Sequence, residues 1–238
     1  MSESVLLELA SWGKVQRGES PPERWGDHDE ATAANLAYIR LKNLIVSLEL
    51  RPGSTLRESE LQERLGVGRT PLRDALHHLA HDGMLRIYPR RAVVVAQLGM
   101  SQIREIFEVR LALEPAAAAL AAERRTPSEL AALVQLSTEL RASRERPDAS
   151  KFLEADRVFH GSLAQYAQNT LLVAYIERLQ VLNVWLWNMY FETCGVRHTD
   201  LFAHEPIIEA VGAAHPKLAE NAMREHILRS KEQLLTGF

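Results

Sequence analysis

Two arginines and a threonine form the first group of residues whose types and spacing suggest a chemistry. Arg69, Thr70 and Arg73 lie in the run GRTPLRDAL, with the arginines four residues apart. In a helix this spacing sends both guanidinium groups to the same side. A guanidinium can form two hydrogen bonds to O6 and N7 of guanine, and the threonine hydroxyl can contact a phosphate or a base. The spacing is also compatible with an amphipathic helix whose basic residues face water.

A carboxylate and three imidazoles form the second group. Asp156 and His160 are four residues apart and therefore share a helix face, while His204 and His226 follow in later segments. Such a set is typical of Zn²⁺, Ni²⁺ or Mn²⁺ sites that keep coordination positions open for a ligand. It also supports hydrolysis by an activated water. Because spacing does not show that the four side chains converge, structural histidines at packed helix contacts stay the alternative.

The arginines need a helix whose first turn is exposed, and the local sequence predicts one. Apolar periodicity predicts helices at about 31–48 and 58–65, and a glycine-containing turn follows the second. Thr70 is expected to cap the next helix, with Pro71 at its first position and Gly83 as its stop. This order of elements is typical of a helix-turn-helix, in which the second helix enters the DNA major groove.

Two short β runs after this helix predict a wing. They cover 85–88 and 92–96, and the basic pair Arg90 and Arg91 lies between them. At the tip of a hairpin these arginines suit the minor groove or phosphates. Arg57, at the start of the preceding helix, is expected to hold the DNA backbone.

The remaining chain predicts helices only. Ser101 is expected to cap a long helix that runs to about Arg125 and bends at Pro115. Thr126 and Glu129 form a capping box that starts a new helix. Four more helices are expected at 150–168, 171–192, 200–213 and 216–235.

The chain is long enough for two domains. We expect a poorly ordered arm at 1–30, a winged helix-turn-helix domain at 31–97 and an all-α bundle at 100–238, so the fold class is mainly α. Apolar residues make up 46% and charged residues 25%, an ordinary globular mixture without an apolar run near the ~18 residues of a membrane span. The start of the chain does not read as a signal peptide, which favours a cytoplasmic protein.

Charge and cysteine content agree with this division. Residues 36–95 hold ten Lys or Arg and six Asp or Glu, whereas the whole chain has a net charge of −3. A basic segment in an acidic chain suggests a polyanion-binding module. The single cysteine, Cys194, excludes an intrachain disulfide and fits a reducing compartment.

The first half of the chain resembles a bacterial family. Residues 36–96, with RPGSTLRESELQERLGVGRTPLRDALHHLAHDGML, are similar to the winged helix of GntR-type regulators. The resemblance implies an operator-binding regulator with Arg69, Thr70 and Arg73 at its DNA-contacting positions. Two residues depart from the family pattern, since Leu48 and Arg91 stand where the family usually has glycine.

The second half resembles the FCD ligand-binding domain of the FadR-type GntR subfamily. The similar pieces are IREIFEVRLALEPAAAALAAER, DRVFHGSLAQYAQNTLL and HEPIIEAV with NAMREHI. The resemblance implies a divalent metal at Asp156, His160, His204 and His226, and a small carboxylate effector that completes its coordination. Arg110, Trp185 and Asn188 are the expected effector-binding residues. The alternatives are an Arg110–Glu114 ion pair, on the surface or between helices, and aromatic residues that belong to the core or to a dimer interface.

Together these patterns favour a ligand-responsive regulator, most simply a repressor. We expect a bacterial, nucleoid-associated homodimer that binds a palindromic operator and is not an enzyme. The alternative is a metal-dependent enzyme that acts on a small organic acid.

Overall fold

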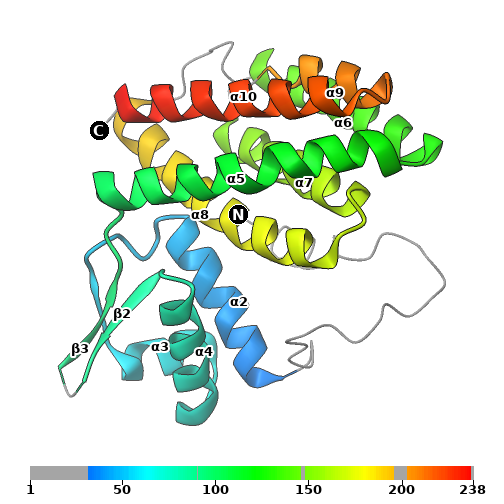
Figure 1. Ribbon diagram of the computed structural model, residues 1–238. Helices are drawn as coiled ribbons and strands as arrows, with labels where there is room; N and C mark the ends of the chain where they lie inside the picture. Colours follow the sequence, from blue (N-terminus) through cyan, green and yellow to red (C-terminus); the bar gives the residue numbers. More distant parts are fainter. Residues whose placement is uncertain (1–31, 90, 146–147, 196–202, 237–238) are drawn as a thin grey trace.

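The computed structural model describes residues 32–89, 91–145, 148–195 and 203–236. A small unit of helices and strands lies below a larger group of helices in Figure 1, and α8 of the larger group packs against α2 of the smaller. In these ranges all strands belong to the small unit. The predicted mainly α fold, a winged helix-turn-helix followed by a helical bundle, is therefore confirmed. The arm predicted at 1–30 lies outside the described residues.

The small unit consists of helices α2 (Ala33–Val46), α3 (Glu58–Leu65) and α4 (Arg69–His81) and strands β1 (Thr55–Leu56), β2 (Leu85–Tyr88) and β3 (Ala92–Val95). The strands form an antiparallel sheet in the order β1-β3-β2. Strand β1 was not predicted, because two residues carry no alternating pattern. It pairs with β3 and closes the sheet beside the wing hairpin.

The inward stripe predicted for α4 is buried. Leu72, Ala75, Leu76 and Leu79 are at most 2% exposed and pack with residues of α2, α3 and the sheet. Burial of one apolar face holds α4 in place and leaves its opposite face to solvent.

The predicted cap of α4 is wrong by two positions. The helix begins at Arg69, and Gly68 is the N-cap, whose carbonyl accepts from the backbone N–H of Leu72 at 3.2 Å. Gly66, in the left-handed conformation, and the extended Gly68 complete the turn earlier than expected. Thr70 and Pro71 therefore lie within the first turn, where a missing proline N–H costs nothing.

Leu48, which stands after α2 where the family usually has glycine, adopts the left-handed backbone conformation that glycine favours. Leu48 has φ 63°, and its N–H donates to the carbonyl of Ile45 at 3.1 Å. A Cβ in this region costs about 1–2 kcal/mol. The half-buried Leu48 side chain packs against the winged-helix core, and this contact offsets part of that cost.

The larger unit contains helices α5 (Met100–Arg124), α6 (Pro127–Glu145), α7 (Ala149–Tyr166), α8 (Thr170–Cys194), α9 (Glu205–Gly212) and α10 (Pro216–Thr236). Helices α5 and α10 run side by side across the top of Figure 1. The predicted helices are confirmed, although α9 begins five residues later than expected. No helix in the described part of the chain is long and apolar enough to cross a membrane.

The caps of the larger unit are partly as predicted. Thr126 and Glu129 form the expected capping box: the Thr126 N–H donates to the Glu129 carboxylate at 2.7 Å, and the Glu129 N–H donates back to the Thr126 hydroxyl at 3.2 Å. Ser101 does not cap α5. Gly99 is the N-cap, its N–H donates to the Gln102 side chain at 3.1 Å, and the Ser101 hydroxyl donates to Glu105. Helix α5 continues past Pro115.

Candidate nucleic-acid interface and metal centre

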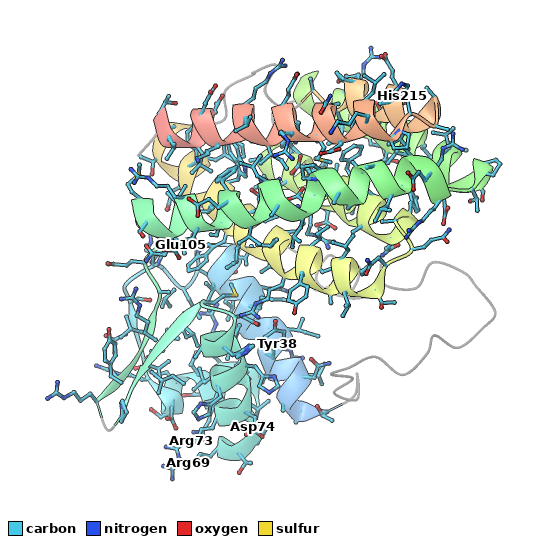
Figure 2. The ribbon with its side chains drawn as sticks, in the orientation of Figure 1. Tyr38, Arg69, Arg73, Asp74, Glu105 and His215 are labelled. Carbon is cyan, nitrogen blue, oxygen red and sulfur yellow. The ribbon has the colours of Figure 1, made fainter. Side chains whose placement is uncertain are left out.

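The exposed start of α4 carries the predicted DNA-reading residues. Arg69, Thr70 and Arg73 are all exposed. Figure 2 shows both arginines at the end of the small unit that points away from the larger one. A helix N-terminus that is exposed and carries two guanidinium groups is the geometry needed to enter a major groove.

Two ion pairs lie beside this helix end. The Arg73 Nε donates to Glu58 Oε2 at 3.1 Å, and its Nη2 is 3.5 Å from Oε1. The Arg57 Nη1 donates to Glu60 Oε1 at 2.9 Å, and both of these side chains are well exposed. Glu58 was not predicted as part of the interface, because the contact joins α3 to α4.

The wing lies beside α4 as predicted. The Arg91 N–H donates to the Tyr88 carbonyl at 3.0 Å, which closes the hairpin turn, and Arg91 is exposed. Arg90 lies outside the described residues.

The four predicted metal ligands converge inside the larger unit. Asp156 and His160 come from α7, His204 is the N-cap residue of α9, and His226 lies in α10. All four are buried, and one ligand atom from each lies within 4.8 Å of the others. Donors on opposite sides of one ion are separated by about 4 Å, since each bond is about 2.0–2.2 Å long. Three separate segments therefore bring the set together at nearly the required spacing.

The pKa shifts of Asp156 and His226 suit a cation. Burial alone would raise the pKa of Asp156, but the neighbouring His160, His204 and His226 outweigh it and hold the pKa below its usual range. Burial, followed by repulsion from His204 and His160, lowers the pKa of His226 well below its usual range. An ionised carboxylate and a neutral imidazole are the forms that bind metals.

A buried glutamate that sequence reasoning did not assign to the site holds one of these ligands. Glu114 Oε2 is 2.5 Å from His160 Nδ1, and Glu114 Oε1 accepts from Arg110 Nε at 2.5 Å. Burial alone would raise the pKa of Glu114, but Arg110 and His160 together lower it to about 2. A carboxylate that accepts from the outer nitrogen of a ligating histidine fixes its tautomer and leaves Nε2 for the ion.

Arg110 is fully engaged in the interior. It is 1% exposed, pairs with Glu114 and donates from Nη1 to Asn183 Oδ1 at 2.6 Å. The partner in the alternative prediction, Glu114, is confirmed, but the ion pair is buried within α5 and is not on the surface or between helices, as that prediction had it. Asn183 was missed, because its contact joins α8 to α5 across 73 residues of sequence.

Trp185 and Asn188, two of the residues predicted to bind an effector, lie at the contact between the two units. Trp185 is buried in the winged-helix core, and Asn188 Nδ2 donates to the Val46 carbonyl at the end of α2 at 2.8 Å. Helix α8 is apolar around much of its circumference, so its sequence did not indicate which face meets which neighbour. These residues join the two units.

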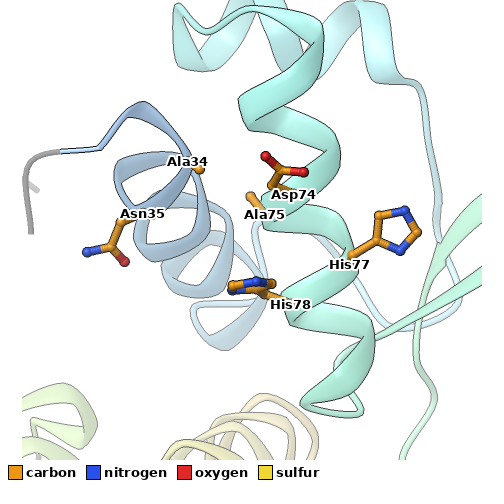
Figure 3. Close-up of a pocket in the computed structure, with 6 residues that line it drawn as sticks. All are labelled: Ala34, Asn35, Asp74, Ala75, His77 and His78. Atoms are coloured by element: carbon orange, nitrogen blue, oxygen red, sulfur yellow. The ribbon is translucent and has the colours of Figure 1, made fainter. Parts of the chain in front are cut away.

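A surface pocket of about 180 Å³ lies between α2 and α4 (Figure 3). It is lined by Ala34, Asn35, Asp74, Ala75, His77 and His78. None of the residues predicted to bind an effector lines it.

A winged helix with an arginine-bearing recognition helix, joined to a helical unit with a buried Asp-His-His-His cluster, defines a two-domain transcriptional regulator. The model for bacterial regulatory proteins of the gntR family matches residues 33–95, and the model for the FCD domain matches residues 105–229. The chain therefore belongs to the gntR family of bacterial regulatory proteins and carries an FCD domain.

Two related proteins from Escherichia coli are named as transcriptional regulators, in agreement with this family assignment. The chain is 32% identical to the HTH-type transcriptional repressor RspR of Escherichia coli K12 over 197 residues, which cover 83% of this chain and 86% of RspR. It is 34% identical over 141 residues to the HTH-type transcriptional regulator McbR of the same organism, covering 59% and 64% of the two chains.

Solved structures show the same arrangement of elements. The structure of E. coli McbR/YncC matches with a TM-score of 0.75 at 26% identity and covers 87% of this chain and 98% of its own. A GntR regulator structure from Rhodococcus sp. RHA1 matches with a TM-score of 0.70 at 20% identity, covering 86% of this chain and 98% of its own, which is a likeness of fold.

Proposed function

We propose that this regulator is a repressor whose operator affinity is controlled by a small carboxylate effector at a metal-containing site in the FCD domain. The main support for DNA binding is the exposed pair Arg69 and Arg73 at the free end of α4. The relative RspR is named a transcriptional repressor, which supports repression over activation.

In this proposal the first turn of α4 reads bases. Arg69 and Arg73 contact guanine edges, each contact being worth roughly 1–3 kcal/mol of discrimination. Thr70 lies between them and bonds a phosphate or a base. Arg57 and the wing residues Arg90 and Arg91 bind backbone phosphates and fix the register.

Two copies of the chain are needed for a palindromic operator. Two recognition helices then enter major grooves about one helical turn, roughly 34–36 Å, apart. Loss of simultaneous contact with both half-sites lowers the overall affinity sharply, because the second contact profits from the effective concentration created by the first. A small change in the placement of the DNA-binding units is therefore enough to release the operator.

The Asp-His-His-His cluster fits a divalent metal ion by its own chemistry. Among the described residues, His160 Nε2 and His226 Nδ1 are buried without a hydrogen-bond partner. Buried polar atoms normally find partners, so orphaned imidazole nitrogens that face a carboxylate favour a cation between them. Asp156, His160, His204 and His226 would hold Zn²⁺, Ni²⁺ or Mn²⁺, which would offer open positions to a carboxylate ligand.

The contacts of Arg110 and α8 support a route from this site to the DNA-binding unit. Arg110 joins Glu114, next to His160, to Asn183 on α8. Five residues later on the same helix, Asn188 bonds the end of α2. A ligand that shifts His160 or Arg110 would act on α8 and so on the winged helix, provided that it binds the two arrangements unequally.

Selection of bound duplexes from a random pool tests the proposal. The purified protein is mixed with the pool with and without Zn²⁺, Ni²⁺ or Mn²⁺ and a panel of small carboxylates. We expect a palindromic sequence to be enriched, and its recovery to fall when metal and the right acid are both present. No enrichment under any condition would contradict the function.

The alternative function is a metal-dependent enzyme in which the same buried cluster is the hydrolytic site. Turnover of a small organic acid that chelation abolishes would establish that alternative.

A further inference from the structure

The carboxylate of Glu58 lies against the guanidinium of Arg73 on the outer surface of the winged helix. Two hydrogen bonds of 3.1 Å and 3.5 Å join Nε and Nη2 of Arg73 to the two carboxylate oxygens. Glu58 is the first residue of α3, and Arg73 lies one turn into α4. The pair therefore bridges the two helices of the helix-turn-helix at the end proposed to meet DNA.

Stability is a weak reason for this pair. The side chains of Arg73 and Glu58 are 49% and 32% exposed. Ion pairs this exposed contribute about 0–1 kcal/mol to folding, since water screens them and two long side chains lose freedom. The buried leucines of α3 and α4 already hold the two helices together.

For DNA binding in general the carboxylate is unfavourable. A negative charge at the edge of a DNA-binding surface repels phosphates and cancels much of the charge of its arginine. An arginine that served only as a phosphate contact would bind the phosphate more tightly without a neighbouring carboxylate. The arrangement makes physical sense if discrimination between sequences matters more than total affinity.

Glu58 leaves Arg73 one free edge. A guanidinium offers five N–H donors in a rigid fork, and Glu58 occupies the edge formed by Nε and Nη2. The edge formed by Nη1 and Nη2 stays available, and this edge can donate two parallel hydrogen bonds to O6 and N7 of guanine. Fixing the side chain before binding also lowers the rotamer entropy lost in the complex.

We infer that Glu58 is a positioning residue that gives Arg73 its sequence specificity, by aiming its free edge at a base and weakening its attraction to phosphates. This inference rests on the proposed role of Arg73 in operator recognition. The ligand is the guanine edge of one base pair in each half-site.

The test compares the full-length chain with Glu58→Gln, which keeps the size of the side chain and removes its charge. Fluorescence anisotropy measures Kd for the selected operator and for a random duplex of the same length. We expect Glu58→Gln to bind the random duplex more tightly and to lower the ratio of operator affinity to random affinity about tenfold, ~1.4 kcal/mol.

Glu63→Gln is the matched control, because Glu63 is exposed on the same helix and the charge change is equal. It should strengthen both affinities alike and leave their ratio within about twofold. Equal ratios in wild type, Glu58→Gln and Glu63→Gln would overturn the inference and leave Glu58 as a surface charge. Thermal unfolding of each variant shows whether a changed ratio comes with a changed fold.

A double-mutant cycle separates positioning from an independent effect. If Glu58 acts through Arg73, Glu58→Gln should cause no further loss of specificity in an Arg73→Ala background, and both changes should relax the preference at the same base pair. Additive losses at different base pairs would overturn the inference. Failure of the wild-type chain to select any operator would instead contradict the proposed function itself.

Discussion

Two of the side chains proposed to bind DNA or metal, Arg73 and His160, contact carboxylates of other helices. His160 is held by Glu114, which is held in turn by Arg110. On the surface, Glu58 does the same for Arg73. In both places a carboxylate orients a nitrogen-bearing side chain, so under the proposed function the chemistry would also depend on residues that do not themselves contact the metal or the base.

Removal of the Arg73 guanidinium tests base recognition. Arg73→Ala is expected to weaken specific operator binding by about 1–3 kcal/mol and to leave the fold intact, because the side chain is half-exposed. Fluorescence anisotropy with the selected operator measures the loss. Arg229→Ala, the same charge change at an exposed position of α10, should have little effect. Unchanged binding by Arg73→Ala would refute the assigned role.

Removal of two imidazoles tests the metal site. The double variant His160→Ala with His204→Ala is expected to contain less than about a tenth of the metal of the wild type, since two of four ligands are lost. Elemental analysis of the purified proteins measures metal per chain. His215→Ala, an exposed histidine outside the cluster, should keep full metal content. A fully loaded double variant would place the metal elsewhere.

At the scale of elements, the C-terminal end of α4 is bonded to α2 and α8. Asp82, the C-cap residue of α4, accepts from the Tyr38 hydroxyl of α2 at 2.7 Å. Arg178 of α8 lies 3.3 Å from the same carboxylate and also donates to the His81 carbonyl. The free end of α4 faces solvent while its other end is fixed by two helices, so its direction follows theirs.

The Tyr38 contact predicts a dependence of stability on pH. Burial, and then the bond to Asp82, raise the pKa of Tyr38 above its usual value of 10.0. The folded state thus holds the phenolic proton more tightly than the unfolded chain does. The resulting stabilisation is complete below about pH 10 and is lost as the pH rises above it.

Tyr38→Phe is therefore expected to lose about 2 kcal/mol near pH 7 and to show a shallower fall of stability above pH 10 than the wild type. Urea unfolding between pH 7 and 11.5 measures both. Tyr88→Phe, at an exposed tyrosine of β2, should follow the wild-type profile. Parallel curves for wild type and Tyr38→Phe would contradict the explanation.

At the scale of the whole molecule, α8 is common to both domains. Its Asn183 contacts the Arg110 network, Trp185 enters the winged-helix core, and Asn188 bonds the end of α2. The helix backbone between these contacts is continuous. Under the proposed function, a change at the Asp-His-His-His cluster would therefore reach the winged helix through this one continuous helix.

Loss of the Asn188 contact should uncouple the two domains. Asn188→Ala is expected to cost about 1 kcal/mol of stability and to reduce the effector-induced change in operator affinity at least twofold, with metal content unchanged. Operator titrations with and without effector measure this change. Thr193→Ala, which removes a local bond within α8, serves as the control. A full effector response in Asn188→Ala would exclude this contact from the coupling.

Local sequence patterns determined most of the fold. The boundaries of α3 and β2, the buried stripe of α4 and the Thr126 capping box were all predicted, because each depends on residues within a few positions of one another. Residue types nominated the four candidate metal ligands, but their spacing alone favoured structural histidines, and it was the resemblance to the family that made a metal site the preferred interpretation.

Only the tertiary structure decided which of these residues meet. The approach of His204 and His226 to α7, the Glu114–His160 and Glu58–Arg73 contacts, and the place of Trp185 and Asn188 between the domains all join segments distant in sequence. Helical periodicity gives the face of a residue but not the neighbour of that face. Packing of whole helices, driven by burial of their apolar sides, selects the neighbours and so creates the site.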